Sequence, residues 1–212
     1  MEPLTLWVDH HFISPYALTA FVSLEEKRLP YTLSTVSLPK AEQQAPAYGA
    51  RTGRVPSLQH GDYWLAESTA IAEYLAETFP HPGHPRLYPA DLRERGICRE
   101  VMSWLRSDLD AIREERGTHT VFYDEPVEPL SPRATRAVVR LLKLCEALIP
   151  GGRTTLFADW CIADVDLAMM LQRLRHSGDA LPARFVSYAD ANWARPSVEK
   201  WRSLPRPTYT PY

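Results

Sequence analysis

Hydrophobic and polar residues recur along the first eighty positions with two different periods. Leu4, Leu6 and Val8 recur with a period of two, which predicts a β-strand. Residues 15–29 then carry apolar side chains at helical spacing, so a helix follows this strand. Polar residues with Gly and Pro at 40–53 predict a loop with room for a short helix. The remaining patterns predict strands at 31–38, 55–59 and 63–65, and an amphipathic helix with Ile71, Tyr74, Leu75 and Phe79 on one face. The resulting order is β-α-β followed by β-β-α.

A different pattern begins after residue 80. Residues 81–90 are rich in proline and contain a glycine, which neither a helix nor a central strand accommodates, so this segment is predicted to be a linker. Beyond it, apolar residues recur at helical spacing almost throughout. The predicted helices are a long one over 91–116, one carrying Val138 to Leu148, a fully buried one over 162–174 and a short one near 196–204. The chain is therefore predicted to form an α/β domain at 1–80 and an all-α domain at 91–212.

Composition and charge narrow the range of functions. The 212 residues include 24 Lys and Arg against 26 Asp and Glu, a net charge of -2. This balance argues against nucleic acid or a membrane surface as a partner, because such partners are usually bound by a strongly basic face. The start, Met1-Glu2-Pro3, lacks the pattern of a signal peptide, and no apolar run reaches membrane-spanning length. These features predict a cytoplasmic globular protein.

Cysteine and histidine spacing predicts neither disulfide bonds nor a metal site. The cysteines are three in number and widely spaced, which does not make a disulfide framework. The pairs His10-His11 and His81/His84 lack a third ligand at a recognisable spacing. We therefore expect no metal in this protein.

The dipeptide Ser14-Pro15 opens the first predicted helix directly after the first strand. A helix N-terminus stabilises an anion beside it, and a thiolate there becomes a nucleophile at physiological pH. Ligands of β-α-β folds also bind at this position. The ordinary explanation is that Ser14 only caps the helix, because serine is common at that position.

Two further dipeptides stand at the starts of elements. In Val55-Pro56, a cis peptide bond would free the backbone of Val55 to pair with an extended peptide, whereas a trans proline would only mark the start of a strand. Arg54 beside it is suited to a ligand carboxylate. In Glu67-Ser68, the two residues together would hold an amino-acid head group: the carboxylate takes an ammonium, and the hydroxyl takes a carboxylate. Each residue alone is equally well explained by helix capping.

The order of these motifs in one chain resembles that of the glutathione S-transferases, in particular Ser-type bacterial members with theta-like N-terminal motifs. Ser-Pro opens the first helix, Val-Pro the third strand and Glu-Ser the next helix. Cys161-Ile162-Ala163-Asp164 is similar to the family's Ser/Thr-x-x-Asp capping signature, with Cys in place of Ser or Thr. The resemblance spans essentially the whole chain. It implies a thioredoxin-like N-terminal domain, an all-helical C-terminal domain and a homodimer.

Carried over residue by residue, the resemblance implies that Ser14 is the catalytic residue and hydrogen-bonds the sulfur of glutathione. Val55, before a cis Pro56, would pair with the cysteinyl backbone, and Glu67 with its neighbour would hold the γ-glutamyl end. Arg54 would contact the glycine carboxylate. The implied glutathione-binding residues are Lys40, Arg54, Val55, Pro56, Glu67 and Ser68.

The implied activity is transfer of glutathione to small hydrophobic electrophiles, or reduction of hydroperoxides by glutathione. The electrophile pocket would lie in the helical domain, with loose candidates in Trp104, Arg106, Ser107, Asp110 and Arg113. One alternative is a non-catalytic binding or assembly protein of the same fold. A second is a glutathione-dependent isomerase or dehalogenase. Disulfide reduction by the N-terminal domain is disfavoured, because no cysteine precedes Cys98.

Overall fold

The computed structural model describes residues 2–210 and divides into two compact units. The first unit comprises the chain up to Leu87 together with the residues from Ser197 onward, and the second comprises Tyr88–Pro196. The sequence analysis assigned all of 91–212 to the helical domain, whereas the residues after 196 pack with the first unit. Residues 1, 211 and 212 of the predicted domains lie outside the described residues.

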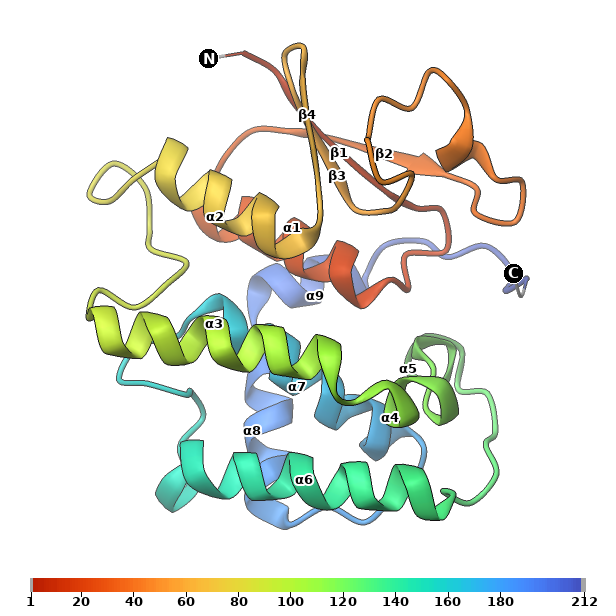
Figure 1. Cartoon of the computed structure of the whole chain (residues 1–212), viewed down its shortest axis with the longest axis vertical. Coiled ribbons are helices and arrows are strands. Elements are labelled where there is room, and N and C mark those ends of the chain that lie inside the picture. Colours follow the sequence, from red (N-terminus) through yellow and green to blue (C-terminus); the bar gives the residue numbers. More distant parts are fainter. Residues whose placement is uncertain (1, 211–212) are drawn as a thin grey trace. The chain divides into compact units, whose positions relative to one another are not determined.

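The first unit is built on a four-stranded mixed sheet with two helices on one side (Figure 1). The strands are β1 (Leu4–Asp9), β2 (Thr32–Val36), β3 (Ser57–His60) and β4 (Tyr63–Ala66), in the order β2-β1-β3-β4. β1 runs parallel to β2 and antiparallel to β3, which pairs antiparallel with β4. The helices are α1 (Pro15–Lys27) and α2 (Ser68–Thr78). The predicted β-α-β, β-β-α order and thioredoxin-like fold are confirmed.

The loop between β2 and β3 packs an aromatic cluster onto the sheet. The rings of Trp7 and Trp64 stack at 5.8 Å, and Tyr48 from the loop meets Trp7 edge-on at 6.0 Å. Gly49 lies so close to Trp64 that a Cβ atom there would sit 2.7 Å from the indole ring, which explains why this position has no side chain. A short 3₁₀ helix, Glu42–Gln44, lies in the same loop, as the sequence allowed.

The last helix, α9 (Pro196–Arg202), packs against α1. Its Trp201 is fully buried and meets Phe21 at a ring distance of 5.2 Å. Lys200 Nζ lies 2.5 Å from a carboxylate oxygen of Glu25. Beyond the helix, Arg206 donates through Nη2 to the carbonyl of Phe12 at 3.2 Å. These contacts tie the end of the described chain to the segment between β1 and α1.

The second unit is all-helical, as predicted. Its helices are α3 (Leu92–Ser107), α4 (Asp110–Glu115), α5 (Thr118–Tyr123), α6 (Pro132–Leu148), α7 (Ile162–His176) and α8 (Ala183–Trp193). Neither α5 nor α8 was predicted. Within residues 2–210, every helix is too short or too polar to cross a membrane.

The prediction of one helix over 91–116 is wrong, because α3 ends at Ser107 and α4 begins after a break. Two arginine side chains bind carbonyl groups at the break. Arg113 Nη1 donates to the carbonyl of Leu105 at 2.7 Å, and Arg140 Nη2 donates to that of Asp108 at 3.0 Å. Carbonyl groups near a helix end need such partners once their intrahelical donors are lost. The apolar spacing continues across the break and therefore hides it.

The buried carboxylate of Asp164 fixes the N-terminus of α7. It accepts hydrogen bonds from the backbone N–H of Cys161 and of Leu156, each at 2.8 Å, and from the hydroxyl of Tyr188 at 2.7 Å. Burial raises the pKa of Asp164, and these hydrogen bonds act in the opposite direction. The Sγ atom of Cys161 lies 3.6 Å from that of Cys98, and this contact and burial raise the pKa of the Cys161 thiol. The capping signature is thus present with a thiol at its first position.

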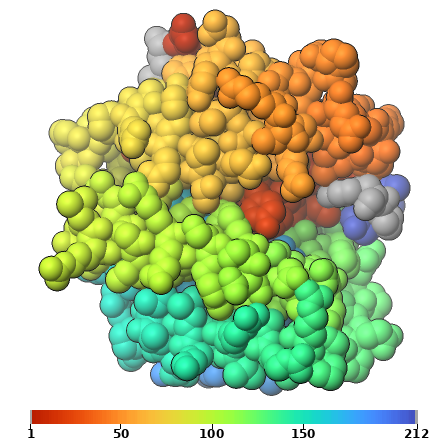
Figure 2. Space-filling view, in the orientation of Figure 1, coloured from red at the N-terminus to blue at the C-terminus, as the bar shows by residue number. Residues whose placement is uncertain are grey.

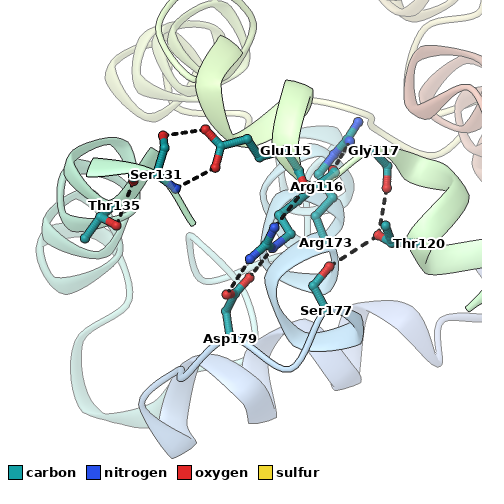
Figure 3. Close-up of polar contacts among 9 residues, drawn as sticks. All are labelled: Glu115, Arg116, Gly117, Thr120, Ser131, Thr135, Arg173, Ser177 and Asp179. Carbon is teal, nitrogen blue, oxygen red and sulfur yellow. Dashed lines mark hydrogen bonds and ion pairs between the residues drawn. The ribbon is translucent and has the colours of Figure 1, made fainter. Parts of the chain in front are cut away.

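A polar network joins α4, α6 and α7 inside the second unit (Figure 3). Buried Arg116 forms a bidentate pair with Asp179, at 2.6 and 2.9 Å, and its carbonyl accepts from Arg173 at 2.6 Å. Glu115, beside it in sequence, accepts from both the N–H and the hydroxyl of Ser131, at 2.8 and 2.5 Å. Ser131 is also the N-cap of α6, so Glu115 holds the start of that helix.

The stability of this network should depend on pH through Glu115. Hydrogen bonds from the Ser131 hydroxyl and N–H lower the pKa of Glu115. A carboxyl group whose pKa is lower in the folded state stabilises the fold at pH values above its pKa in the unfolded chain, which is ~4.3 for glutamate. This stabilisation is lost as the pH falls through the folded-state pKa. Glu115→Gln should therefore lower the free energy of unfolding by about 1 kcal/mol at neutral pH, and by less near pH ~3. Urea denaturation at both pH values measures the difference.

The matched control is Glu114→Gln, one residue earlier on α4. Among residues 2–210, Glu114 pairs only with the exposed Arg133, so its replacement should change stability little at either pH. Equal losses for the two variants at neutral pH would contradict the role given to Glu115.

Candidate functional site

Strand register brings the predicted site residues to one edge of the sheet. Asp9, at the end of β1, pairs with Val36 at the end of β2, so the loops after both strands leave from the same edge. Ser57, the first residue of β3, pairs with Trp7 of β1 and with Ala66, the last residue of β4. Four chain segments continue from these four strand ends. They carry the predicted site residues Ser14, Lys40, Arg54 to Pro56, and Glu67 with Ser68.

Ser14 is the N-cap of α1 and retains a hydroxyl proton to donate. Its Oγ accepts from the backbone N–H of Ala17 at 3.2 Å, and Pro15 occupies the first helical position. In residues 2–210, no acceptor is bound to the hydroxyl proton, and the residue is only partly buried. A hydroxyl that accepts at a positive helix end is a stronger donor to an anion in front of it. The capping explanation and the ligand-binding explanation therefore apply to the same side chain.

Asp9 holds the segment that leads to Ser14. Its carboxylate is fully buried and accepts from the N–H of Ile13 at 2.9 Å and from the N–H of Ser14 itself at 3.1 Å. Burial raises the pKa of Asp9, and the two hydrogen bonds and nearby His11 oppose this shift. Sequence reasoning missed this residue. The available signal was an acidic residue at the inner end of a buried strand, where a charge needs a local partner.

Val55 presents an unpaired stretch of backbone. The Val55–Pro56 bond is cis, which decides between the two alternatives left open by the sequence. In the described part of the chain, neither the N–H nor the C=O of Val55 has a hydrogen-bond partner. The carbonyl of Arg54 accepts from the hydroxyls of Tyr48 at 2.8 Å and Ser57 at 2.9 Å, so this turn is fixed while the Arg54 side chain stays exposed.

Glu67 and Ser68 differ in exposure. Glu67 is exposed and has φ of 71°, a backbone conformation that non-glycine residues rarely adopt. Its carboxylate has no partner among residues 2–210. Ser68 is buried at the first position of α2, and the first N–H groups of a helix have no acceptor within the helix itself. Lys40 lies in the turn after β2 with an exposed side chain. A strained backbone at an exposed acidic residue is typical of a functional site.

The residues considered for an electrophile pocket mostly have structural partners. Arg106 pairs with Asp166 at 2.6 Å, and Asp110 pairs with Arg133. Arg113 binds the carbonyl of Leu105, as described above. The hydroxyl of Ser107 donates to Asp108 at 2.7 Å. In the described part of the chain, only the half-buried Trp104 side chain of this set has no such polar contact, so the other four are explained by their structural partners.

Both units match family models. The model of the glutathione S-transferase N-terminal domain matches residues 13–78, and that of the C-terminal domain matches residues 91–206. The second match alone spans more than half of the chain. The chain belongs to the glutathione S-transferase family. The fold class and the family resemblance drawn from the sequence are thereby confirmed.

Comparison with individual relatives supports the assignment of this chain to the glutathione S-transferase family. The chain is 30% identical over 132 residues to mouse glutathione S-transferase theta-3, covering 59% of the chain and 53% of that protein. The chain thus spans about half the length of the curated relatives it matches. A solved structure of a glutathione transferase homolog from Burkholderia with bound glutathione is 38% identical, with a TM-score of 0.78, and covers 95% of this chain and 96% of the other. A second homolog structure, from Sulfitobacter, is 23% identical with a TM-score of 0.69, which supports the fold alone.

Replacing Asp9 tests whether it holds the Ser14 segment. Asp9→Asn keeps one acceptor oxygen and turns an N–H donor toward the second backbone N–H. We expect a loss of about 2 kcal/mol in the free energy of unfolding, and faster amide hydrogen exchange at Ile13 and Ser14. Urea denaturation and residue-resolved exchange measure the two effects. Asp62→Asn, in the exposed β3–β4 turn, is the control and should change neither. Unchanged exchange at Ser14 in the Asp9 variant would refute the assignment.

Proposed function

We propose that this protein is a glutathione transferase that joins glutathione to small hydrophobic electrophiles. The observation that carries the proposal is the combination, at one sheet edge, of the unpaired backbone of Val55 with the free hydroxyl proton of Ser14. An extended peptide can pair with the first while its side chain reaches the second. Glutathione is a tripeptide with a thiol on its central residue, and the Burkholderia homolog was solved with glutathione bound.

The remaining residues suit the two ends of the tripeptide. The γ-glutamyl end carries an ammonium and a carboxylate, which match the carboxylate of Glu67 and the hydroxyl and helical N–H groups at Ser68. The glycine end carries a carboxylate, which matches the exposed cations Arg54 and Lys40. Pro56 sets the direction of the Val55 backbone.

Catalysis would come from stabilising the thiolate. The Ser14 hydroxyl donates to the sulfur, and the N-terminal end of α1 adds a favourable field, so the pKa of the bound thiol falls. The thiol proton leaves to solvent, and the sulfur attacks the electrophilic carbon. The C–S bond forms as a leaving group departs or, in an activated double bond, as the neighbouring carbon takes a proton from solvent. The protein supplies position and electrostatics, and glutathione is the nucleophile.

The same thiolate could attack an oxygen of an organic hydroperoxide, which breaks the O–O bond, releases the alcohol after protonation and leaves glutathione as a sulfenic acid. A second glutathione would then displace water to form glutathione disulfide, which would make the protein a glutathione peroxidase. A glutathione-dependent isomerase or dehalogenase remains a rival function, because it would share the glutathione site and differ only in the electrophile that meets the sulfur. A non-catalytic binding protein remains a second rival, because the fold alone does not fix the function. A cytoplasmic homodimer without metal remains the prediction for the assembly.

Replacing Ser14 separates activity from binding. Ser14→Ala should lower kcat by about 10- to 100-fold and raise the pKa of the bound thiol by about 1 unit, because one charge-assisted hydrogen bond to the sulfur is lost. Steady-state kinetics with a model electrophile and the ultraviolet absorption of the thiolate against pH measure these effects. Ser14→Thr keeps both the cap and the donor and is the matched control. An alanine variant as active as the wild type would exclude Ser14 from catalysis.

Replacing Glu67 tests the site for the γ-glutamyl end. Glu67→Ala should weaken glutathione binding by about 10-fold or more, because the ammonium of the ligand loses its charged partner. Calorimetric titration at neutral pH measures the affinity. Glu77→Ala, near the other end of α2, is the control and should bind like the wild type. If the folded wild type binds no glutathione, the non-catalytic alternative replaces the transferase.

A further inference from the structure

A polar pocket lies in the first unit, at the end of α1. It has a volume of about 430 Å³ and is formed by Lys27 and Arg28 together with the segment 81–85 that follows α2. The residues of this segment lie on the surface next to α2, in the yellow region of Figure 2. The pocket lies at the C-terminal end of α1, whereas Ser14 caps the N-terminal end, so it is separate from the proposed glutathione site.

The pocket is lined by cationic and imidazole side chains and by no carboxylate. Its four ionisable lining residues are Lys27, Arg28, His81 and His84. Arg86 stands next to them, since its Nη2 donates to Nδ1 of His81 at 3.2 Å. Among the described residues, neither Lys27, Arg28 nor Arg86 forms an ion pair with a carboxylate. Several cations therefore lie close together without a counter-charge from the described part of the protein.

Lys27 is the least expected of these cations. Its side chain is 99% buried, yet among residues 2–210 it makes a single hydrogen bond, from Nζ to the carbonyl of Phe79 at 2.8 Å. Two of its three N–H donors are left without a partner in the described chain. Burial lowers the pKa of Lys27, and the charge of Arg86 lowers it further. A buried ammonium normally has an anionic partner, because burial of a lone charge is costly.

The two histidines are held in fixed orientations. A carbonyl only accepts, so the contact of His84 Nδ1 with the carbonyl of Lys27 at 2.9 Å places a proton on Nδ1. A guanidinium only donates, so His81 accepts through Nδ1 and carries its proton on Nε2 when neutral. The ring of His84 also packs edge-on against Phe79 at 5.5 Å. These contacts fix both imidazole rings in the wall of the pocket.

We propose that this pocket binds a phosphoryl group, either free phosphate or the phosphate of a small monoester. A carboxylate would neutralise one cation, whereas a phosphate dianion offers more charge opposite Lys27 and more acceptor oxygens to Arg28 and to the Nε2–H of His81. The volume exceeds that of a phosphate ion, which leaves space for a small organic substituent. The proposal does not depend on the transferase activity, because none of these residues belongs to the glutathione site.

The test compares phosphate with chloride at matched ionic strength. Sodium phosphate should raise the thermal midpoint of the wild type by about 3 °C at ten times its dissociation constant, and calorimetric titration should show one site. The rise should be unchanged in saturating glutathione, because the two sites are separate. A parallel titration with glycerol phosphate distinguishes the sources: tighter binding than phosphate assigns the pocket to a monoester, and equal or weaker binding assigns it to the free ion.

Two variants locate the effect. Lys27→Met keeps the length of a buried side chain without its charge, and Arg28→Asn removes an exposed cation at a left-handed position that asparagine tolerates. Each should reduce phosphate affinity by about 10-fold or more. Arg136→Ala, an exposed arginine on α6, is the control and should keep wild-type affinity. No phosphate effect beyond chloride in the wild type, or an effect that persists in both pocket variants, would overturn the proposal.

Discussion

The candidate site depends on the way β1 pairs on both sides. β1 is parallel to β2 and antiparallel to β3, so the ends of β1, β2 and β4 and the start of β3 lie along one edge. Four chain segments, separated by up to about fifty residues in sequence, are thereby brought to the same place. A shift of one residue in either pairing would turn the side chains of β1 to opposite faces and separate Asp9 from the segment that it holds.

Asp9 links this arrangement to chemistry. Its carboxylate joins the end of β1 to the backbone of Ile13 and Ser14, and Ser14 in turn caps α1. The serine is thus fixed by its own N–H on one side and by the helix on the other. This fixation leaves the hydroxyl proton as the one polar feature of Ser14 that faces no partner in the described chain. Preorganisation of this kind lowers the cost of orienting a donor when a ligand arrives.

The elements of the first unit could be predicted because period and capping agree there. Ser14-Pro15 and the alternation of Leu4, Leu6 and Val8 mark their elements directly. The break after α3 could not be predicted, since the guanidinium groups that stabilise it come from residues 113 and 140. Asp9 was missed for a similar reason: its role is visible only when its hydrogen-bond partners are known. Helix α8 carries a polar side and a short apolar face, which is a weak signal without its neighbours.

The packing of α9 on α1 has a consequence for how the protein is made. Ser197 donates to Glu26 across 171 positions of sequence, and the N–H of Thr210 donates to His11 across 199. The first unit therefore needs residues from both sides of the second one. During synthesis, α1 and the strands leave the ribosome before α9 does. The apolar surface around Phe21 therefore stays uncovered until Trp201 has been synthesised. The all-helical unit is continuous in sequence and can fold before α9 is synthesised. The first unit, whose synthesis begins first, is therefore completed last.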